Sequence, residues 1–204
     1  MKANRRSLER LHLTHQLLIR GSRIRALVRG TWKASVFAEN FWEALGNLAR
    51  QKLTIRRRTQ VEAEPLPRYF SVELLASTKV VTIDKVPMPP LSKMGLARFA
   101  KFESGDFDGI TYLDTFFLKK GCAAYERLYF HELIHIVQWS LFGPERFLAT
   151  YADGLEKYGY RDSPLEMMAY NAEATFVQSP NIFDAEELVA NELSRIGTLP
   201  LEEK

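Results

Sequence analysis

The sequence predicts an α+β fold in which helices come first, a small mixed or antiparallel sheet follows, and further helices close the chain. Three observations predict this order. Apolar residues recur at helical spacing before residue 60, short β-rich runs broken by prolines follow, and a long helical pattern begins after Gly121. The chain of 204 residues is long enough to bury a hydrophobic core.

The first predicted domain is a basic helical segment, residues 1–64, with helices over 8–27 and 33–53. Residues 1–60 hold 14 Lys and Arg against 3 acidic residues, whereas residues 61–204 hold 14 against 22, so a net charge of +11 precedes one of −8. A basic segment can bind nucleic acid, an anionic membrane surface or the acidic remainder of its own chain. We expect the last of these rather than nucleic acid.

The middle of the chain is expected to form the sheet. β-rich runs span Tyr69–Leu75 and Lys79–Val86, and a proline-rich break follows at residues 87–90. Beyond the break, we expect a hairpin that pairs Leu96–Glu103 with Ile110–Leu118 across a turn with the sequence GDFDG.

The most informative helix is expected from Tyr125 to Phe142, where a Gly-Pro pair ends it. It contains the string HELIH. His131 and His135 are four residues apart and therefore share one face of the helix, close enough to bind one metal ion, while Glu132 can accept a proton from water that the metal activates. The surrounding positions are apolar, which predicts a buried helix, and a divalent cation would satisfy all three buried polar groups together.

The composition restricts the kind of metal site and the compartment. Because Cys122 is the single cysteine, no intrachain disulfide and no site built on several thiolates can form, so a metal must be held by His and carboxylate. We expect an inert thiol at this position. The sequence shows no transmembrane segment and no clear signal peptide, which predicts a cytoplasmic protein.

The HELIH helix, which continues with Ile-Val-Gln, resembles that of the zincin metallopeptidases, and the resemblance covers residues 110–173. It implies a zincin-like domain over residues 65–204, in which His131 and His135 bind Zn²⁺ and Glu132 is the general base. No histidine follows the motif. The gluzincin-type subgroup, which takes its third ligand from a glutamate on a downstream helix, is therefore the closer match.

Two glutamates on the next predicted helix compete for the place of the third ligand. Glu166 stands in the first turn, where it also fits a capping box with Ser163, and Glu173 lies two turns further along a similar face. We expect either of them, but hardly both, to reach the two histidines, and Glu166 is the preferred choice; another group or water is the remaining alternative. Tyr170 stands where gluzincins carry an aspartate that orients a ligand histidine.

The resulting functional hypothesis is a zinc-dependent peptidase or amide hydrolase that acts on a peptide or protein substrate. Its catalytic residues would be Glu132 and a group that stabilises the negative charge on the substrate, for which we choose Tyr170 among four candidates: Tyr170, Tyr158, Tyr160 and Arg161. The resemblance also implies that the run Ile110–Leu118 is a sheet edge that pairs with extended substrate.

A second hypothesis keeps the fold but not the reaction. In it, the chain is an inactive zincin-like scaffold or partner-binding module, and its basic N-terminal helices contact an anionic surface. The position of Glu132 between the two histidines favours the enzyme, because a structural zinc site seldom keeps a carboxylate there.

Overall fold

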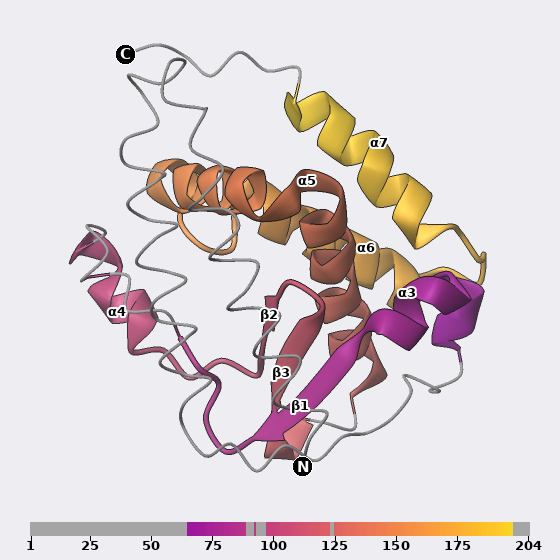
Figure 1. Cartoon of the computed structure of the whole chain (residues 1–204), viewed down its shortest axis with the longest axis horizontal. Coiled ribbons are helices and arrows are strands. Elements are labelled where there is room, and N and C mark those ends of the chain that lie inside the picture. Colours follow the sequence, from indigo (N-terminus) through magenta and orange to yellow (C-terminus); the bar gives the residue numbers. More distant parts are fainter. Residues whose placement is uncertain (1–64, 89–91, 93–96, 123–124, 198–204) are drawn as a thin grey trace, which may run out of the picture. The chain divides into compact units, whose positions relative to one another are not determined.

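The computed structural model describes residues 65–88, 92, 97–122 and 125–197 (Figure 1). The expected N-terminal helices and the domain boundary at residue 64 lie outside these residues and stay predictions. The described residues belong to two compact units, which we treat separately. Met88, Ser92 and the stretch 97–105 belong to the smaller unit, and the larger unit contains the other described residues.

The larger unit is α+β, as the sequence predicts. Its elements, in chain order, are the short 3₁₀ helix η1 (Leu66–Arg68), α3 (Val72–Ser77), β1 (Lys79–Ile83), β2 (Gly109–Tyr112), β3 (Thr115–Lys119), the short 3₁₀ helix η3 (Lys120–Cys122), α5 (Glu126–Tyr158), α6 (Pro164–Gln178) and α7 (Ala185–Gly197). Among the described residues, no helix combines the length and the apolar character needed to cross a bilayer.

The sheet has three strands in the order β1-β3-β2 and is mixed. β1 runs parallel to the central strand β3, in the register Val80↔Phe116, and β2 runs antiparallel to it, in the register Thr111↔Phe116. The run Lys79–Val86 was predicted as a strand, and β1 confirms its first part. The side chains of Phe116 and Leu118 in β3 are fully buried, as a central strand requires.

The predicted hairpin partner is wrong. The strand pairs are formed inside Ile110–Leu118 itself, where β2 and β3 are joined by Leu113 and Asp114, and Leu113 adopts a positive φ of 56°. Leucine is rare in that conformation, so the glycines of GDFDG gave the stronger turn signal although the chain turns elsewhere.

The run Leu96–Glu103, predicted as a strand, is helical in the smaller unit. Its described part forms the 3₁₀ helix η2 (Ala97–Phe99) and α4 (Ala100–Glu103), and Ser92 donates hydrogen bonds from N and Oγ to Glu103 Oε2 at 2.9 and 2.8 Å. Phe99 and Phe102 are three residues apart among Ala, Lys and Glu, all of which favour a helix over a strand.

The run Tyr69–Leu75 was also predicted as a strand and is instead a turn followed by α3. The helix begins because Ser71 caps it: Ser71 Oγ accepts a hydrogen bond from the Leu74 amide at 3.2 Å. Tyr69 and Phe70 are buried against aromatic side chains of the later helices, so the apolar residues that suggested a strand are core residues of a turn.

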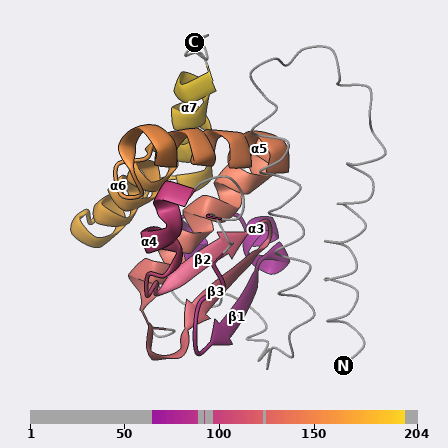
Figure 2. The same cartoon turned by 90° about the vertical axis from the view of Figure 1, so that its left-hand side faces the viewer.

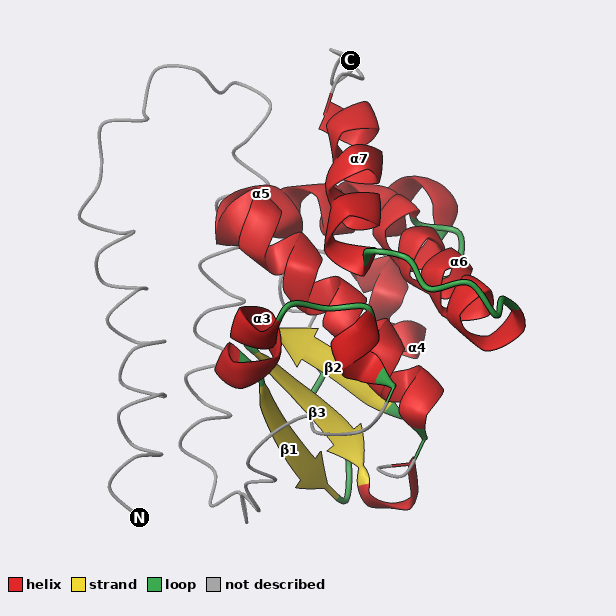
Figure 3. Ribbon diagram, turned by 90° about the vertical axis from the view of Figure 1, so that its right-hand side faces the viewer, coloured by secondary structure: helices red, strands yellow, loops and turns green. Residues whose placement is uncertain are grey.

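Helix α5 is the centre of the larger unit. Figures 2 and 3 show it running over the sheet, and it contacts β2 and β3 as well as α6 and α7. At Gly143 the backbone leaves helical geometry, with φ 70° and ψ 166°, and Pro144 follows. This break confirms the predicted end of the first helix at Phe142, and the chain continues as a second helical stretch in a new direction. The expected burial of this helix is confirmed for residues 129–139, whereas Leu141 is exposed.

Candidate metal centre

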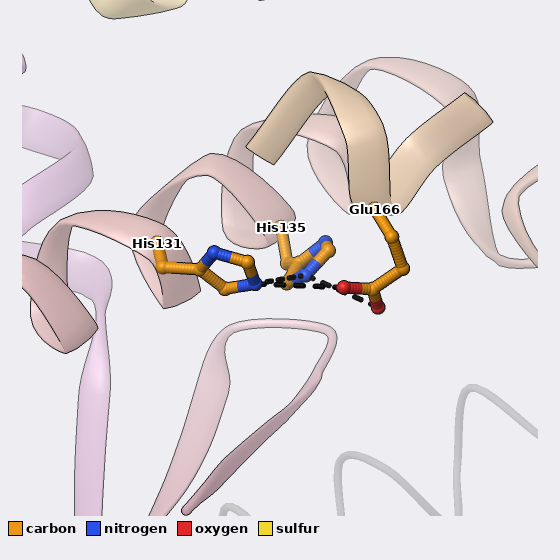
Figure 4. A group of neighbouring side chains, drawn as sticks. All are labelled: His131, His135 and Glu166. Carbon is orange, nitrogen blue, oxygen red and sulfur yellow. Dashed lines mark hydrogen bonds and ion pairs between the residues drawn. The ribbon is translucent and has the colours of Figure 1, made fainter. Parts of the chain in front are cut away.

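Three side chains from two helices converge in the interior of the larger unit. His131 and His135 come from the first half of α5, and Glu166 comes from the first turn of α6; Figure 4 shows their polar ends pointing toward one another. His131 Nε2 lies 3.2 Å from His135 Nε2 and 3.5 Å from Glu166 Oε2, and His135 Nε2 lies 3.5 Å from Glu166 Oε1. All three side chains are buried.

These separations are close to those between the ligand atoms of a four-coordinate zinc ion. With metal–ligand bonds of about 2.0–2.1 Å, neighbouring corners of a tetrahedron lie about 3.3–3.4 Å apart. The two Nε2 atoms lie 3.2 Å apart, and each lies 3.5 Å from a different oxygen of Glu166. One ligand atom from each of the three residues lies within 4.8 Å of the other two. Glu166 Oε2 is buried without a hydrogen-bond partner, and a cation at this point would provide one. The group can therefore hold a metal ion, and its donor types suit zinc.

The hydrogen bonds around the two histidines direct the correct nitrogen to the centre. His131 Nδ1 lies 3.0 Å from Glu173 Oε2, and His135 Nδ1 lies 2.8 Å from Gln138 Oε1. The amide nitrogen of Gln138 donates to the Leu165 carbonyl at 3.0 Å, which assigns its oxygen to His135. Because both partners accept, both Nδ1 atoms carry a proton, and in the neutral form of each ring the Nε2 lone pair faces the shared point.

The carboxylates of this group favour a positive charge among them, as the pKa shifts of His131 and Glu166 show. Burial lowers the pKa of His131, but the carboxylates of Glu166, Glu173 and Glu132 raise it to about 10. Burial also raises the pKa of Glu166, yet His135 and His131 shift it the other way, to a net value well below its usual range. In the metal-free protein, a proton on His131 thus supplies the positive charge that these carboxylates need.

Glu132 lies beside this group, on the side of β2. Its carboxylate is buried, and Thr111 Oγ1 donates to Oε2 at 2.6 Å. Gly109 makes room for it, since a Cβ at that position would lie 2.3 Å from Glu132 Oε1. Burial raises the pKa of Glu132, while the two histidines and the Thr111 hydrogen bond oppose the shift. A raised pKa suits a carboxylate that has to accept and then return a proton.

Three tyrosines extend the site toward α6 and the loop before it. Tyr151 donates to Glu166 Oε1 at 2.8 Å and so fixes that carboxylate. The Tyr170 ring lies 4.6 Å from the His131 ring, measured between centroids. Burial raises the pKa of Tyr170, and a hydrogen bond from the Tyr160 hydroxyl opposes that shift.

The two competing glutamates occupy different positions. Glu166 joins the histidines, whereas Glu173 contacts the far nitrogen of His131 and lies outside the group. The capping alternative for Glu166 is not observed, because the backbone of Ser163 has the extended geometry of a cap but its side chain makes no capping hydrogen bond. The carboxylate that contacts Nδ1 of His131 therefore comes from Glu173, and no carboxylate stands at position 170, which is Tyr170.

Several contributors to the site were missed from the sequence. The spacing of three residues between Gln138 and His135 places both on one helix face, and this spacing is a sequence signal for their contact. Thr111, Gly109 and Tyr151 carry no local signal, because each reaches the site only through tertiary packing.

The structure near the site also bears on the predicted edge strand and on Cys122. The run Ile110–Leu118 is not a single edge strand: it forms β3, which is the central strand of the described sheet, and β2, which lies at one edge. The Thr111 carbonyl on β2 already accepts a hydrogen bond from the Trp139 indole at 3.2 Å.

Cys122 is free and half-buried, and a hydrogen bond to Asp108 raises the pKa of its thiol.

Comparisons of the chain with protein-family models, with curated proteins and with solved structures find no match. The zincin resemblance therefore stays a prediction, and the geometry of the site has to support any functional proposal.

Proposed function

We propose that this chain is a zinc-dependent peptidase or amide hydrolase with Glu132 as its general base. The observation that supports the proposal best is a buried group of two histidines and a glutamate, whose ligand atoms lie within 4.8 Å of one another, beside a buried carboxylate that is not a member of the group. Within the described residues, the group has three members, and a zinc ion with three protein ligands keeps one position for water or substrate.

The proposed chemistry divides between the metal and the protein. Bound zinc would act as a Lewis acid and lower the pKa of water to about 7. Glu132 would accept the proton of the attacking water while the new C–O bond forms, and would pass that proton to the amine nitrogen as the C–N bond breaks. The Tyr170 hydroxyl would donate a hydrogen bond to the negative oxygen that develops on the substrate carbonyl.

The proposal extends to substrate placement and compartment. An extended peptide would lie along β2, because β3 is paired on both sides in the described sheet. The free thiol of the single cysteine suits the cytoplasm, where thiols stay reduced.

A second candidate, an inactive scaffold with a structural metal, is favoured by the burial of the site. The side chains of His131, His135 and Glu166 are only 6%, 7% and 3% exposed. The two candidates differ in what Glu132 does: the enzyme needs its carboxylate, whereas a structural site needs only its bulk.

The test is therefore the Glu132→Gln variant, which keeps the shape of the side chain and removes the base. Wild type and variant, both loaded with zinc, are incubated with a mixed peptide library, and cleavage is followed by mass spectrometry. We expect equal zinc content and a loss of cleavage of about 10²–10⁴-fold in the variant. Cleavage at the wild-type rate by Glu132→Gln, or no cleavage by the wild type, would favour the scaffold.

A further inference from the structure

The loop between α5 and α6 places a cation beside the candidate metal centre. Arg161 lies in this loop, five residues before Glu166, and its guanidinium carbon lies 5.0 Å from the centroid of the Tyr170 ring. That ring is in turn 4.6 Å from the His131 ring. One aromatic side chain thus connects the guanidinium to the metal group, and stacking holds it there.

Among the described residues, Arg161 has no acidic partner, unlike several other basic residues of the same unit. Lys119, Lys157 and Arg195 are paired with the carboxylates of Asp106, Asp153 and Glu192, respectively. Within the part of the chain that the structure describes, no carboxylate forms an ion pair with Arg161, and its side chain is exposed. The donors of its planar fork are therefore available to a ligand.

The charges of the centre explain why a cation matters at this place. Three carboxylates, those of Glu132, Glu166 and Glu173, surround the histidines. With a divalent metal bound and both histidines neutral, the formal charge of the group is −1, which repels an anionic substrate. The Arg161 guanidinium beside the centre would instead attract a substrate whose carboxylate reaches it. A guanidinium can bind a carboxylate through two parallel hydrogen bonds.

We infer that Arg161 is a specificity-determining residue that binds a carboxylate next to the scissile amide of the substrate. The inference rests on the proposed hydrolase function and names its substrate class. Two sources supply such a carboxylate: the C-terminus of a short peptide, or the side chain of an acidic residue beside the scissile bond.

Binding of zinc-directed probes to the zinc-loaded full chain tests the inference without knowledge of the substrate. Three malonyl hydroxamates serve as probes: one is joined to glycine and carries a C-terminal carboxylate, one is joined to aspartate α-amide and carries a side-chain carboxylate, and one is joined to glycinamide and is neutral. Calorimetry gives the affinity of each for wild type, Arg161→Gln, Arg161→Lys and the control Arg146→Gln. Arg146 is a suitable control because its guanidinium also stacks on an aromatic ring, that of Phe142.

We expect the wild type to bind one carboxylate probe about 10-fold or more tightly than the neutral probe, and the preferred probe identifies the source of the carboxylate. Arg161→Gln should bind that probe no better than the neutral one, Arg161→Lys should keep part of the preference, and Arg146→Gln should keep all of it. Equal wild-type affinity for the three probes, or a preference that survives in Arg161→Gln, would overturn the inference alone. Failure of even the neutral probe to bind would contradict the proposed function, and the inference with it.

Discussion

The Glu173 carboxylate lies 3.0 Å from Nδ1 of His131, on the side of the ring opposite to the group formed with Glu166. This contact holds the proton on Nδ1 and leaves Nε2 as the nitrogen that faces His135 and Glu166. Helix α6 therefore contributes, from residues two turns apart, both a donor and the group that orients another donor.

Replacement of Glu173 tests this relationship. Glu173→Ala should weaken zinc binding by about 10–100-fold, because His131 loses the partner that fixes its tautomer and ring orientation. Glu173→Gln should lose less, since its amide oxygen still accepts from Nδ1. Competition with a chromophoric chelator measures both affinities, with Gln178→Ala, at an exposed position of the same helix, as control. Wild-type affinity in Glu173→Ala would show that the contact has no orienting role.

A methyl group at Gly109 should separate base function from metal binding. The added Cβ would lie 2.3 Å from Glu132 Oε1 and 3.2 Å from Leu118 Cδ2, so the carboxylate has to move. We expect Gly109→Ala to keep its zinc and to lose hydrolytic activity, by up to the 10²–10⁴-fold that a general base typically contributes. Gly121→Ala is the matched control, since a Cβ there meets no atom within 4 Å. Equal activity of Gly109→Ala and Gly121→Ala would contradict this view of Glu132.

Zinc binding should release a proton from His131 at neutral pH. The pKa of His131 in the metal-free fold is raised to about 10, so the ring is protonated at pH 7.5 and has to lose that proton to bind the metal. Calorimetry in buffers of different ionisation enthalpy should report about one proton released per zinc ion. A binding enthalpy that does not depend on the buffer would show that His131 is neutral beforehand.

The same shift predicts how the stability of the metal-free protein depends on pH. Because the pKa is higher in the folded chain than the unfolded value of 6.5, the stabilisation from the protonated ring is complete below pH 6.5. It is lost as the pH rises from 6.5 toward 10. Denaturant unfolding across this range should show the decline in the wild type and a smaller one in His131→Gln.

The turn between β2 and β3 carries backbone strain that a substitution should relieve. Leu113 has a φ of 56°, a conformation that costs a non-glycine residue about 1 kcal/mol. Leu113→Gly should therefore raise the free energy of unfolding or leave it unchanged, in spite of the greater freedom of glycine in the unfolded chain. Urea denaturation measures the change, and a loss above about 1 kcal/mol would show that the Leu113 side chain stabilises the fold more than its backbone strains it.

The parts of the fold and the site that the sequence predicted are those with local signals. HELIH, the apolar positions around it and the Gly-Pro break after Phe142 all lie within one helix, so spacing alone places His131 and His135 on one face. The strand pairing was predicted wrongly because the run Ile110–Leu118 folds back on itself at a two-residue turn that contains Leu113, which no turn rule favours.

Sequence spacing also could not tell the roles of Glu166 and Glu173 apart. Both lie on α6 at a spacing that puts them on similar faces, so the sequence could not assign them separately. The rotation and height of α6 against α5 decide that Glu166 faces both Nε2 atoms while Glu173 reaches Nδ1 of His131. That placement comes from tertiary packing, such as the close approach of Gly154 in α5 to Pro164 at the start of α6.

Metal content tests the central claim most directly. The full chain is purified without a metal-affinity tag, beside His135→Ala, and both are analysed by inductively coupled plasma mass spectrometry together with their unfolding midpoints. We predict close to one zinc per wild-type chain, and loss of zinc with a lower midpoint in His135→Ala. A wild type that contains no metal and takes up none when zinc is added, with a midpoint equal to that of the variant, would contradict the metal centre and reduce HELIH to a buried core helix.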